Sequence, residues 1–373
     1  VQEVLQLNLI EKQFQESKQF FKTHQTKDIK FRKQQLKLLS KSIKDHETEL
    51  LESLKIDLGK GSVEAYATEI GILLKSIKTA RKELKNWAKT KQVDTPLFMF
   101  PSKSYIKPEP YGTILIIGPF NYPVQLLFEP LIGAIAAGNN AIIKPSELTP
   151  HVAQVVRKVI EDVFASDFVA VVEGGVEETQ TLINLPFDYI FFTGSENVGR
   201  IVYEAASKNL VPVTLELGGK SPVIVDETAN IKVASDRISF GKFTNAGQTC
   251  VAPDYILVNR KVKNELIQAF KQSIEEFYGK NIQNSPDFGR IVNTKHFNRL
   301  SELLTIHRNE VIFGGHTDEN EQYIEPTILD GITPQSKIME EEIFGPLLPI
   351  IVYDDFNEAI DIIQSKSLSL IHI

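Results

Sequence analysis

The feature that most constrains the fold is a regular alternation of short apolar runs with helical patterns between residues 113 and 210. The apolar runs cover residues 113–117, 141–143, 168–172 and 189–193. Their lengths are typical of buried strands, and segments with helical periodicity, such as 152–163, separate them. This alternation predicts a parallel sheet with helices on both faces.

The alternation starts again after Pro212. Strands are predicted at 213–217, 223–225 and 255–258, and helices near 231–243 and 262–278. We expect a second α/β domain here, so the sequence predicts two open parallel-sheet domains, 1–211 and 212–373. A chain of 373 residues has the length of two domains of about 150 residues or more each.

The segment before residue 113 has different patterns. Six apolar residues recur at helical spacing on one face: Leu36, Leu39, Ile43, Leu50, Leu54 and Leu58. Gly59 is a candidate C-cap, and a second helix is predicted over 66–89. Residues 95–110 are rich in Pro, Ser and aromatic residues, which favours an extended arm or hairpin.

Composition excludes several classes of function. The net charge of −7 argues against a general nucleic-acid binder. A single cysteine, Cys250, excludes an intramolecular disulfide and a Cys-rich zinc site, and it suits a reducing, cytoplasmic setting. The His residues show no zinc-binding pair, so no metal is expected. No apolar run approaches the ~20 residues of a membrane span.

Two common nucleotide-binding motifs are missing. No G-x-G-x-x-G follows a strand, and the Walker A pattern ending at Ser221 fails because Thr214 replaces its first glycine. Gly194, Ser195 and Gly199 instead lie where a strand ends and a helix begins, which is a ready anion site. An ordinary strand–helix turn is the alternative interpretation.

Cys250 and Glu216 are candidates for chemistry. Cys250 ends the polar, glycine-bearing run 245–250, where a thiol could be activated, although a lone cysteine is commonly a small buried apolar residue. Glu216 closes an apolar strand before two glycines. It is either a general base at a strand end or a solvated carboxylate.

Asn121 and the pair Lys144 and Glu147 also follow predicted strands. Each could be an ordinary turn or cap residue. Together they lie at the carboxyl ends of strands, where open α/β sheets bind ligands.

These segments, taken in order, resemble the signature motifs of the aldehyde dehydrogenases. The motifs are Pro119-Phe-Asn-Tyr-Pro123, Lys144-Pro-Ser-Glu147, Phe192-Thr-Gly-Ser195 with Gly199, Leu215-Glu-Leu-Gly-Gly219, Gly247-Gln-Thr-Cys250 and Glu341-Glu-Ile-Phe-Gly-Pro346. They span most of the chain. The short N-terminus and the run 250–257 are most similar to the class 3 branch of fatty-aldehyde and benzaldehyde dehydrogenases, in a bacterial version.

The resemblance implies a role for each matching residue. Cys250 would be the nucleophile, Glu216 the general base and Asn121 a donor to the oxyanion. The remaining residues would bind the dinucleotide: Lys144 and Glu147 at the adenosine ribose, Gly194, Ser195 and Gly199 beside the pyrophosphate, and Glu342 and Phe344 at the nicotinamide ribose and ring. The cofactor would be NAD or NADP.

The implied activity is oxidation of aldehydes to carboxylic acids through a cysteine thiohemiacetal and a thioester. Medium- or long-chain aliphatic and aromatic aldehydes are the expected substrates. Domain 1–211 would bind the dinucleotide and carry an oligomerisation arm near 92–112, and domain 212–373 would be catalytic. We expect a cytoplasmic homodimer with no nucleic-acid partner and no membrane segment.

The similarity fades after about Gln364, and the family's later glycine-rich segment is missing. We therefore expect a chain truncated at its C-terminus, with an incomplete catalytic domain and dimer interface. Two alternative functions remain: a CoA-acylating aldehyde dehydrogenase, which the base Glu216 disfavours, and an inactive fragment of a broken gene.

Overall fold

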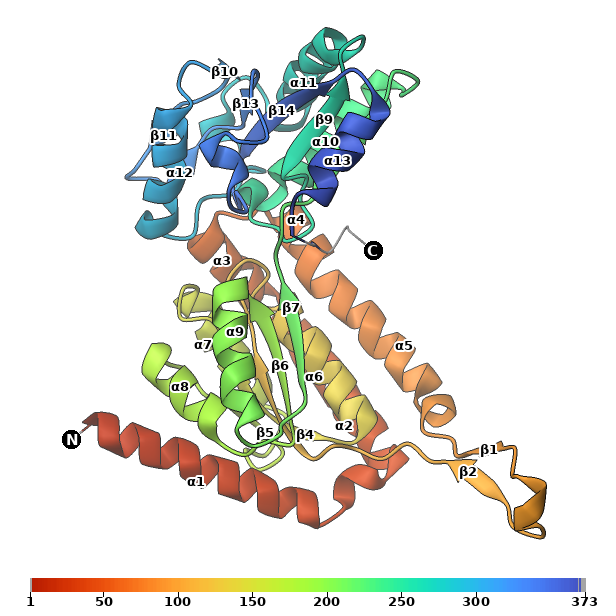
Figure 1. Cartoon of the computed structure of the whole chain (residues 1–373). Coiled ribbons are helices and arrows are strands. Elements are labelled where there is room, and N and C mark those ends of the chain that lie inside the picture. The colour runs from red at the N-terminus through yellow and green to blue at the C-terminus, as the bar shows by residue number, and fades with distance from the viewer. Residues whose placement is uncertain (1, 368, 370–373) are drawn as a thin grey trace. The chain divides into compact units, whose positions relative to one another are not determined.

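The computed structural model describes residues 2–367 and 369 and contains two compact units (Figure 1). Unit 1 comprises Val1–Ser53 and Tyr66–Glu216, and unit 2 comprises Leu54–Ala65 and Leu217–Ile373. The division thus lies after Glu216 rather than after residue 211. The end of the chain, where truncation is expected, includes residues 368 and 370–373, which lie outside the described residues.

The segment 54–65 joins unit 2 although it precedes most of unit 1 in sequence, which was not predicted. The backbone N–H of Arg290 donates to the carbonyl of Leu58 at 2.7 Å. Gly59 follows with φ +67°, as a helix C-cap requires, and a Cβ there would lie 2.9 Å from the Arg290 side chain. A long-range contact therefore decides the membership of this segment.

Unit 1 is built on a five-stranded sheet in the order β5-β4-β3-β6-β7. The strands are β3 (Thr113–Ile117), β4 (Asn140–Lys144), β5 (Val169–Val171), β6 (Tyr189–Gly194) and β7 (Val213–Leu217). β3 pairs in parallel with both β4 and β6. All five residues of β3 and of β4 are buried, because helices cover both faces of the sheet. The predicted parallel sheet is confirmed.

The helices of unit 1 form two groups. They are α1 (Gln2–Lys22), α2 (Ile29–Asp45), α3 (Glu47–Leu58, which crosses into unit 2), α5 (Gly71–Trp87), α6 (Gln125–Ala137), α7 (Pro150–Glu161), α8 (Val176–Asn184) and α9 (Glu196–Ser207). α6 contacts α2 and α5, and α2 also contacts α7. α8 contacts α9 and α1. Figure 1 shows α8 and α9 in front of the sheet and α6 behind it.

The six apolar residues predicted to share one helical face are all fully buried. They lie on two helices rather than one, because α2 ends at Asp45 and α3 begins at Glu47. His46, between them, contacts Glu49 (2.9 Å) and Asp162 (2.7 Å) through its two ring nitrogens. These side-chain contacts compensate for the interrupted helix.

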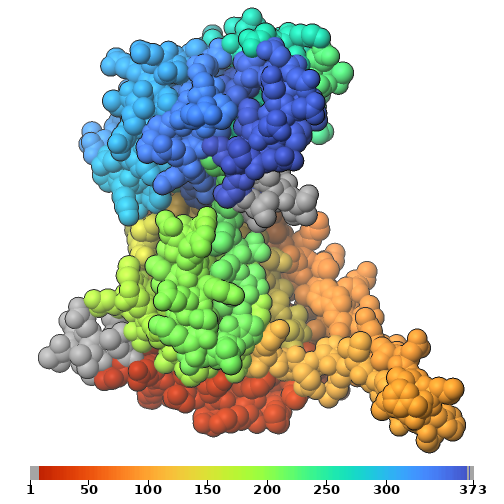
Figure 2. Space-filling view, viewed as in Figure 1, coloured from red at the N-terminus to blue at the C-terminus, as the bar shows by residue number. Residues whose placement is uncertain are grey.

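Residues 91–106 form an antiparallel hairpin of β1 (Lys91–Val93) and β2 (Ser104–Ile106), with a short helix, η3 (Leu97–Met99), near its tip. The hairpin confirms the predicted extended arm. Its apolar side chains are exposed: Leu97 and Phe98 are each 88% exposed and Phe100 is 81% exposed. Figure 2 shows the arm standing away from the rest of unit 1.

Unit 2 contains a second five-stranded sheet in the order β10-β13-β14-β9-β8. Its strands are β8 (Pro222–Val225), β9 (Tyr255–Asn259), β10 (Val311–Phe313), β13 (Thr327–Leu329) and β14 (Leu347–Tyr353). β8, β9, β14 and β13 pair in parallel. β10 pairs with β13 antiparallel, so the expectation of a fully parallel sheet is wrong at this edge. Residues 314–326, which contain the small antiparallel pair β11 (Thr317–Asp318) and β12 (Tyr323–Ile324), connect β10 to β13 without a crossover helix.

The other elements of unit 2 surround this sheet. They are α4 (Ser62–Ala65), α10 (Ile231–Phe243), α11 (Lys263–Tyr278), α12 (Thr294–Ile306), α13 (Phe356–Gln364) and the small pair β11 (Thr317–Asp318) and β12 (Tyr323–Ile324). α10 and α11 pack against each other. The core is apolar and includes Phe243, Phe270 and Leu348. Elements after residue 278 were not predicted individually.

Candidate active site

The chain order of the unit 1 strands reverses beside β3. From β3 the chain proceeds to β4 and β5 on one side, and then returns to β6 and β7 on the other. The gap between the carboxyl ends of β3 and β6 is thus a topological switch point, where open α/β sheets bind ligands. Asn121 follows β3, and Gly194 ends β6.

Lys144 and Glu147 follow the adjacent strand. Lys144 is the last residue of β4 and is 2% exposed, and its Nζ donates to Oε2 of Glu147 at 2.6 Å. The Glu147 side chain remains 45% exposed. A buried ammonium group paired with a half-exposed carboxylate leaves carboxylate oxygens available to hydroxyl donors of a ligand.

The start of α9 has the geometry of an anion site. Gly194 ends β6, and Ser195 is the N-cap, whose hydroxyl accepts from Val198 N–H at 3.4 Å. Gly199 is buried in the first turn. Among the described residues, Oγ1 of Thr193 is buried and has no hydrogen-bond partner. An unsatisfied buried hydroxyl beside a helix N-terminus is a second sign that this end of β6 meets a ligand.

The two remaining unit 1 candidates differ in exposure. Asn121 is 3% exposed, so its amide is held within the protein rather than in solvent. Glu216 is exposed and is the penultimate residue of β7. An exposed carboxylate at a strand end can reach water, as a general base must.

In unit 2 the loop before Cys250 has an unusual backbone. Asn245, Ala246 and Gly247 have φ values of 53°, 51° and 78°, three consecutive left-handed residues. Gln248 supports them, because its Nε2 donates to the carbonyls of Asn245 (3.1 Å) and Arg290 (2.9 Å). Left-handed backbone conformations of non-glycine residues are strained, and such residues are common at functional sites. Cys250 itself is partly exposed, as a reacting thiol requires.

The loop with Glu342 and Phe344 lies against this segment. A Cβ on Gly247 would lie 2.3 Å from the carbonyl oxygen of Gly345, so the two backbones are in direct contact. Phe344 also has a positive φ, 48°. Unit 2 therefore brings two motifs together that are almost one hundred residues apart in sequence.

Glu342 also meets the first glycine after β7. A Cβ on Gly218 would lie 2.0 Å from the Glu342 carboxylate, so glycine lets that carboxylate take this position. Burial raises the pKa of Glu342 to about 7, against the opposing effect of a hydrogen bond from Gly219 N–H. The carboxylate is thus close to its titration point at neutral pH.

The predicted site residues therefore form two groups. Cys250, Glu342 and Phe344 belong to unit 2, on segments that contact one another. The others belong to unit 1: Asn121, Lys144, Glu147, Gly194, Ser195, Gly199 and Glu216. That both groups act on one substrate remains a prediction.

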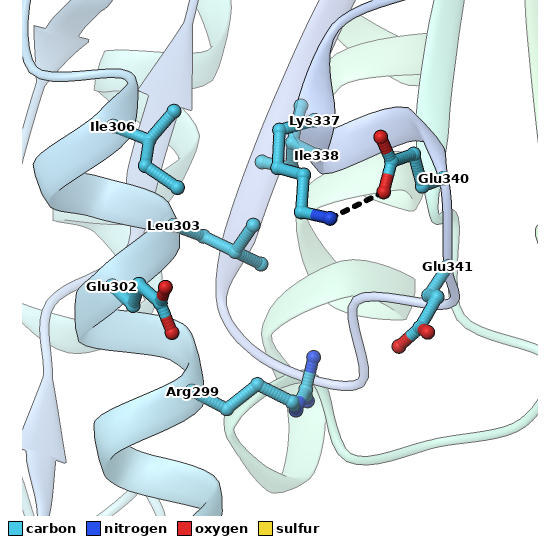
Figure 3. Close-up of a pocket in the computed structure, with 8 residues that line it drawn as sticks. All are labelled: Arg299, Glu302, Leu303, Ile306, Lys337, Ile338, Glu340 and Glu341. Carbon is cyan, nitrogen blue, oxygen red and sulfur yellow. Dashed lines mark hydrogen bonds and ion pairs between the residues drawn. The ribbon is translucent and has the colours of Figure 1, made fainter.

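A separate cavity of about 110 Å³ lies in unit 2 between α12 and residues 337–341 (Figure 3). Leu303, Ile306 and Ile338 form its apolar side. Charged side chains, including Arg299 and Glu341, line the rest, and Lys337 pairs with Glu340. None of the predicted site residues lines this cavity.

Sequence analysis missed the residues that support the unit 2 site. Lys220 and Asp254 form a buried ion pair, and Lys242 is fully buried nearby, with its pKa lowered to about 8 by burial. The only signals were that Lys220 ends the failed Walker A pattern and that Asp254 lies close to Cys250 in sequence.

In the part of the chain that the structure describes, no group of three or more His, Cys, Asp or Glu side chains is arranged to hold a metal ion. Within the same residues, no helix combines the length and the apolar character that crossing a bilayer needs.

Comparison with known proteins agrees with this geometry. Residues 5–371 match the Aldehyde dehydrogenase family. The chain is 69% identical to 4,4'-diaponeurosporen-aldehyde dehydrogenase of Staphylococcus aureus (strain NCTC 8325 / PS 47) over 98% of this chain and 80% of that protein. It is 43% identical to aldehyde dehydrogenase family 3 member A2 of Macaca fascicularis over 97% of this chain and 74% of that protein.

Among solved structures, the substrate-bound state of Staphylococcus aureus AldH is similar with a TM-score of 0.95 and 69% identity. The alignment covers 97% of this chain and 79% of that one. The family match, the relatives and the fold agree, and they bear out the resemblance to class 3 enzymes. The chain belongs to the aldehyde dehydrogenase family and is an oxidoreductase.

Proposed function

We propose that this enzyme oxidises apolar aldehydes to carboxylic acids with NAD or NADP, through covalent catalysis by Cys250. The observation that carries the proposal is the direct contact between the Cys250 loop and the Glu342 loop, at Gly247 and Gly345. This contact supports a thiol and a cofactor-binding carboxylate acting at one place. Members of this family use NAD(P).

The residues of the chain suit a dinucleotide. The N-terminus of α9 and the unpartnered Thr193 hydroxyl fit a pyrophosphate, and the Glu147 carboxylate fits ribose hydroxyls. Glu342 would hold the second ribose, and Phe344 would position the ring. A bound dinucleotide supplies the acceptor for the hydride that leaves the substrate carbon.

Cys250 begins the reaction as a thiolate. Its Sγ forms a bond to the aldehyde carbon, and the electron pair of the C=O bond moves to oxygen, which gives a thiohemiacetal oxyanion. The Asn121 amide and the Cys250 backbone N–H would donate to that oxygen, and one such donor typically lowers the barrier by about 3 kcal/mol. When the C=O bond re-forms, hydride leaves the carbon and a thioester remains on Cys250.

Glu216 completes the cycle. Its carboxylate would remove a proton from water, and the resulting hydroxide would attack the thioester carbon. The C–S bond breaks, the Cys250 thiolate is regenerated and the carboxylic acid departs. The exposure of Glu216 supports this role because the base must meet water.

The substrate class is inferred from chemistry and relatives together. One relative, at 69% identity, is named for 4,4'-diaponeurosporen-aldehyde, and class 3 enzymes resemble this chain throughout. We infer that long, apolar aldehydes, aliphatic or conjugated, are better substrates than short ones. Burying each extra CH₂ of the aldehyde contributes about 0.8 kcal/mol to binding, so KM should fall as the aldehyde becomes longer.

Cofactor preference and assembly belong to the same proposal. The Glu147 carboxylate favours the free ribose hydroxyls of NAD, whereas the Lys144 ammonium group could pair with the extra phosphate of NADP. Both cofactors, NAD and NADP, are therefore tested. The exposed arm around Phe98 supports a homodimer in which arms contact a second copy. Cytoplasmic localisation remains a prediction from the sequence.

The decisive experiment combines Glu216→Gln with mass spectrometry. After mixing with NAD and decanal, the variant should release one equivalent of NADH and accumulate an acyl adduct on Cys250, while the wild type turns over. The matched control is Glu204→Gln, an exposed glutamate of α9, which should behave as the wild type.

Full turnover by Glu216→Gln with no adduct would remove Glu216 from the base role. A wild-type rate that depends on added CoA would favour the acylating alternative. The whole proposal would be contradicted if folded wild-type protein released neither NADH from NAD nor NADPH from NADP.

A further inference from the structure

A buried ion pair in unit 2 has no role in the proposed reaction. Lys220 lies between β7 and β8 and is 6% exposed, and Asp254 lies directly before β9 and is 3% exposed. The Lys220 Nζ donates to Oδ2 of Asp254. Because Asp254 is four residues after Cys250, the pair joins the segment after Glu216 to the segment after the nucleophile.

The same pair is bonded to a third segment. Nζ of Lys220 donates to the carbonyls of Ile338 (3.1 Å) and Glu341 (2.9 Å). Oδ1 of Asp254 accepts from Ile343 N–H at 2.9 Å. An ammonium group has three protons, and all three are used here. The pair thus fixes the backbone on both sides of Glu342.

Apolar packing and hydrogen bonds both hold this loop. Ile338, Met339 and Ile343 are buried in the apolar core of unit 2, and the cavity of Figure 3 lies beside residues 337–341. The backbone also has polar anchors: Arg299 donates to the Ile343 carbonyl at 2.6 Å, and Lys366 donates to the Met339 carbonyl at 3.1 Å. Packing holds the apolar side chains of the loop, and the hydrogen bonds to its carbonyl and N–H groups set the direction of its backbone.

We propose that Lys220 and Asp254 are a positioning pair, which holds the loop 338–343 so that the Glu342 carboxylate meets the nicotinamide-side ribose beside Cys250. The proposed function gives neither residue a contact with substrate or cofactor, so the pair acts through Glu342 and is not catalytic. The inference rests on the proposed function, in which Glu342 contacts the dinucleotide.

Stability alone is a weak reason for such a pair. Taking two charges out of water is costly, and replacing a buried ion pair by neutral residues of similar size is often harmless to stability. A neutral replacement cannot reproduce the three hydrogen bonds that Lys220 donates, to Asp254 and to the carbonyls of Ile338 and Glu341. Loop geometry, rather than folding free energy, is the property that the pair contributes.

The test uses the double variant Lys220→Met/Asp254→Asn, in which both members of the pair become neutral. The amide oxygen introduced at position 254 would still accept from Ile343 N–H, but the two carbonyl bonds of Lys220 are lost. The control is Lys263→Met/Asp330→Asn, another Lys–Asp pair of unit 2, with 2.7 Å between Nζ and Oδ2 and with both residues outside the loop 338–343.

Binding of NADH and of ADP is measured by calorimetry, with the melting temperature of each protein. We expect NADH affinity to fall at least tenfold in the Lys220/Asp254 variant while ADP affinity stays unchanged, because ADP lacks the nicotinamide ribose. The control variant should bind both as the wild type does. Cys250 is the only cysteine, so alkylation by iodoacetamide reports on the Cys250 loop. Bound NADH should protect Cys250 from alkylation less well in the Lys220/Asp254 variant than in the wild type.

Unchanged NADH affinity and protection in a folded double variant would overturn the proposal. If that variant shows no cooperative melt, Lys220→Gln/Asp254→Asn, which keeps an amide donor at position 220, should bind NADH with intermediate affinity, and wild-type affinity there would equally overturn the proposal. Glu342→Gln is measured in parallel. If wild type binds no NADH, the proposed function fails; if Glu342→Gln weakens binding and the pair variants do not, only the positioning role fails.

Discussion

The two units hold their candidate residues in different ways. In unit 1, Lys144 and Glu147 are bonded across three positions of sequence, at the end of the strand that delivers them. In unit 2, Lys220 reaches the carbonyl of Glu341 across 121 positions. The contact between the unit 1 candidates is therefore local in sequence, whereas the contacts around the unit 2 candidates join distant segments.

This difference predicts where substitutions act. In unit 1 a change at a strand end alters one ligand contact and leaves its neighbours in place. In unit 2, Gly247 packs against the backbone of Gly345, so adding one carbon there displaces a whole loop, whereas Gly218 packs against the Glu342 carboxylate, which an added carbon would push aside. Binding and reactivity should thus be separable in unit 1, whereas changes at these two unit 2 contacts should affect both.

The largest effect is expected from Cys250→Ser. Aldehyde oxidation should fall about 10⁴-fold or more, because a hydroxyl is a far weaker nucleophile than a thiolate. Dinucleotide affinity should stay within a factor of about three, because the unit 1 contacts are untouched. Stopped-flow NADH release and calorimetry measure the two quantities. Normal turnover would exclude Cys250 as the nucleophile.

The next effect is expected from Gly247→Ala. Alanine at φ +78° is strained, and its Cβ would collide with the Gly345 carbonyl, so the free energy of unfolding should drop by about 2 kcal/mol or more. Gly133→Ala, in α6 with nothing within 4 Å of the added carbon, should instead stabilise by about 0.5–1 kcal/mol.

Chemical denaturation of both glycine variants measures the comparison. Cys250 alkylation should also change in the Gly247 variant and not in the Gly133 variant. Equal stabilities would mean that the contact between the two unit 2 loops does not constrain the fold.

A smaller effect is expected from pH. Burial raises the pKa of Glu342 to about 7, so its carboxylate is protonated below that pH and accepts ribose hydroxyls poorly. NADH affinity should therefore rise as pH increases through about 7, by roughly tenfold per unit at most below the pKa. Its charged neighbours are Asp254, Lys220 and Lys242, and the pKa of Lys242 is lowered to about 8.

Calorimetric titrations from pH 5.5 to 7.5, in the Cys250→Ser background, measure this dependence before Lys242 titrates. Glu342→Gln should bind NADH weakly with a flat profile. A slope that persists in that variant would assign the dependence to another group.

The smallest effect on stability is expected at the arm. Phe98 is 88% exposed, so Phe98→Ser should change the free energy of unfolding by less than about 0.5 kcal/mol. If arms contact a second copy, the same change should shift the dimer toward monomer in light scattering. Leu210→Ser, at a side chain 90% exposed outside the arm, should leave the mass unchanged. An unaltered dimer in Phe98→Ser would exclude the tip from the interface.

Most regular elements of both units could be predicted because their signals are local. The ranges 113–117, 213–217 and 231–243 coincide with β3, β7 and α10. Apolar periodicity depends on neighbouring residues alone. The break at His46 was missed because the buried leucines keep their spacing across it, and the antiparallel β10 was missed because strand direction leaves no mark in a short apolar run.

The candidate site divides in the same way. Asn121, Lys144, Glu147, Gly194, Glu216 and Cys250 could be singled out because each lies in a short motif beside a predicted strand or turn. Lys220 and Asp254 gave no such signal, since a lysine after two glycines and an aspartate before a strand are ordinary in sequence.

The sequence by itself determined the family, the order of strands and helices and the residues capable of the chemistry, because each of these is expressed within a few neighbouring positions. Only the tertiary structure decided that residues 54–65 join unit 2, that Gly247 meets Gly345 and that Lys220 and Asp254 hold the Glu342 loop. These are pairings between distant segments, and they arise when a buried charge, carbonyl or glycine meets the partner that folding brings to it.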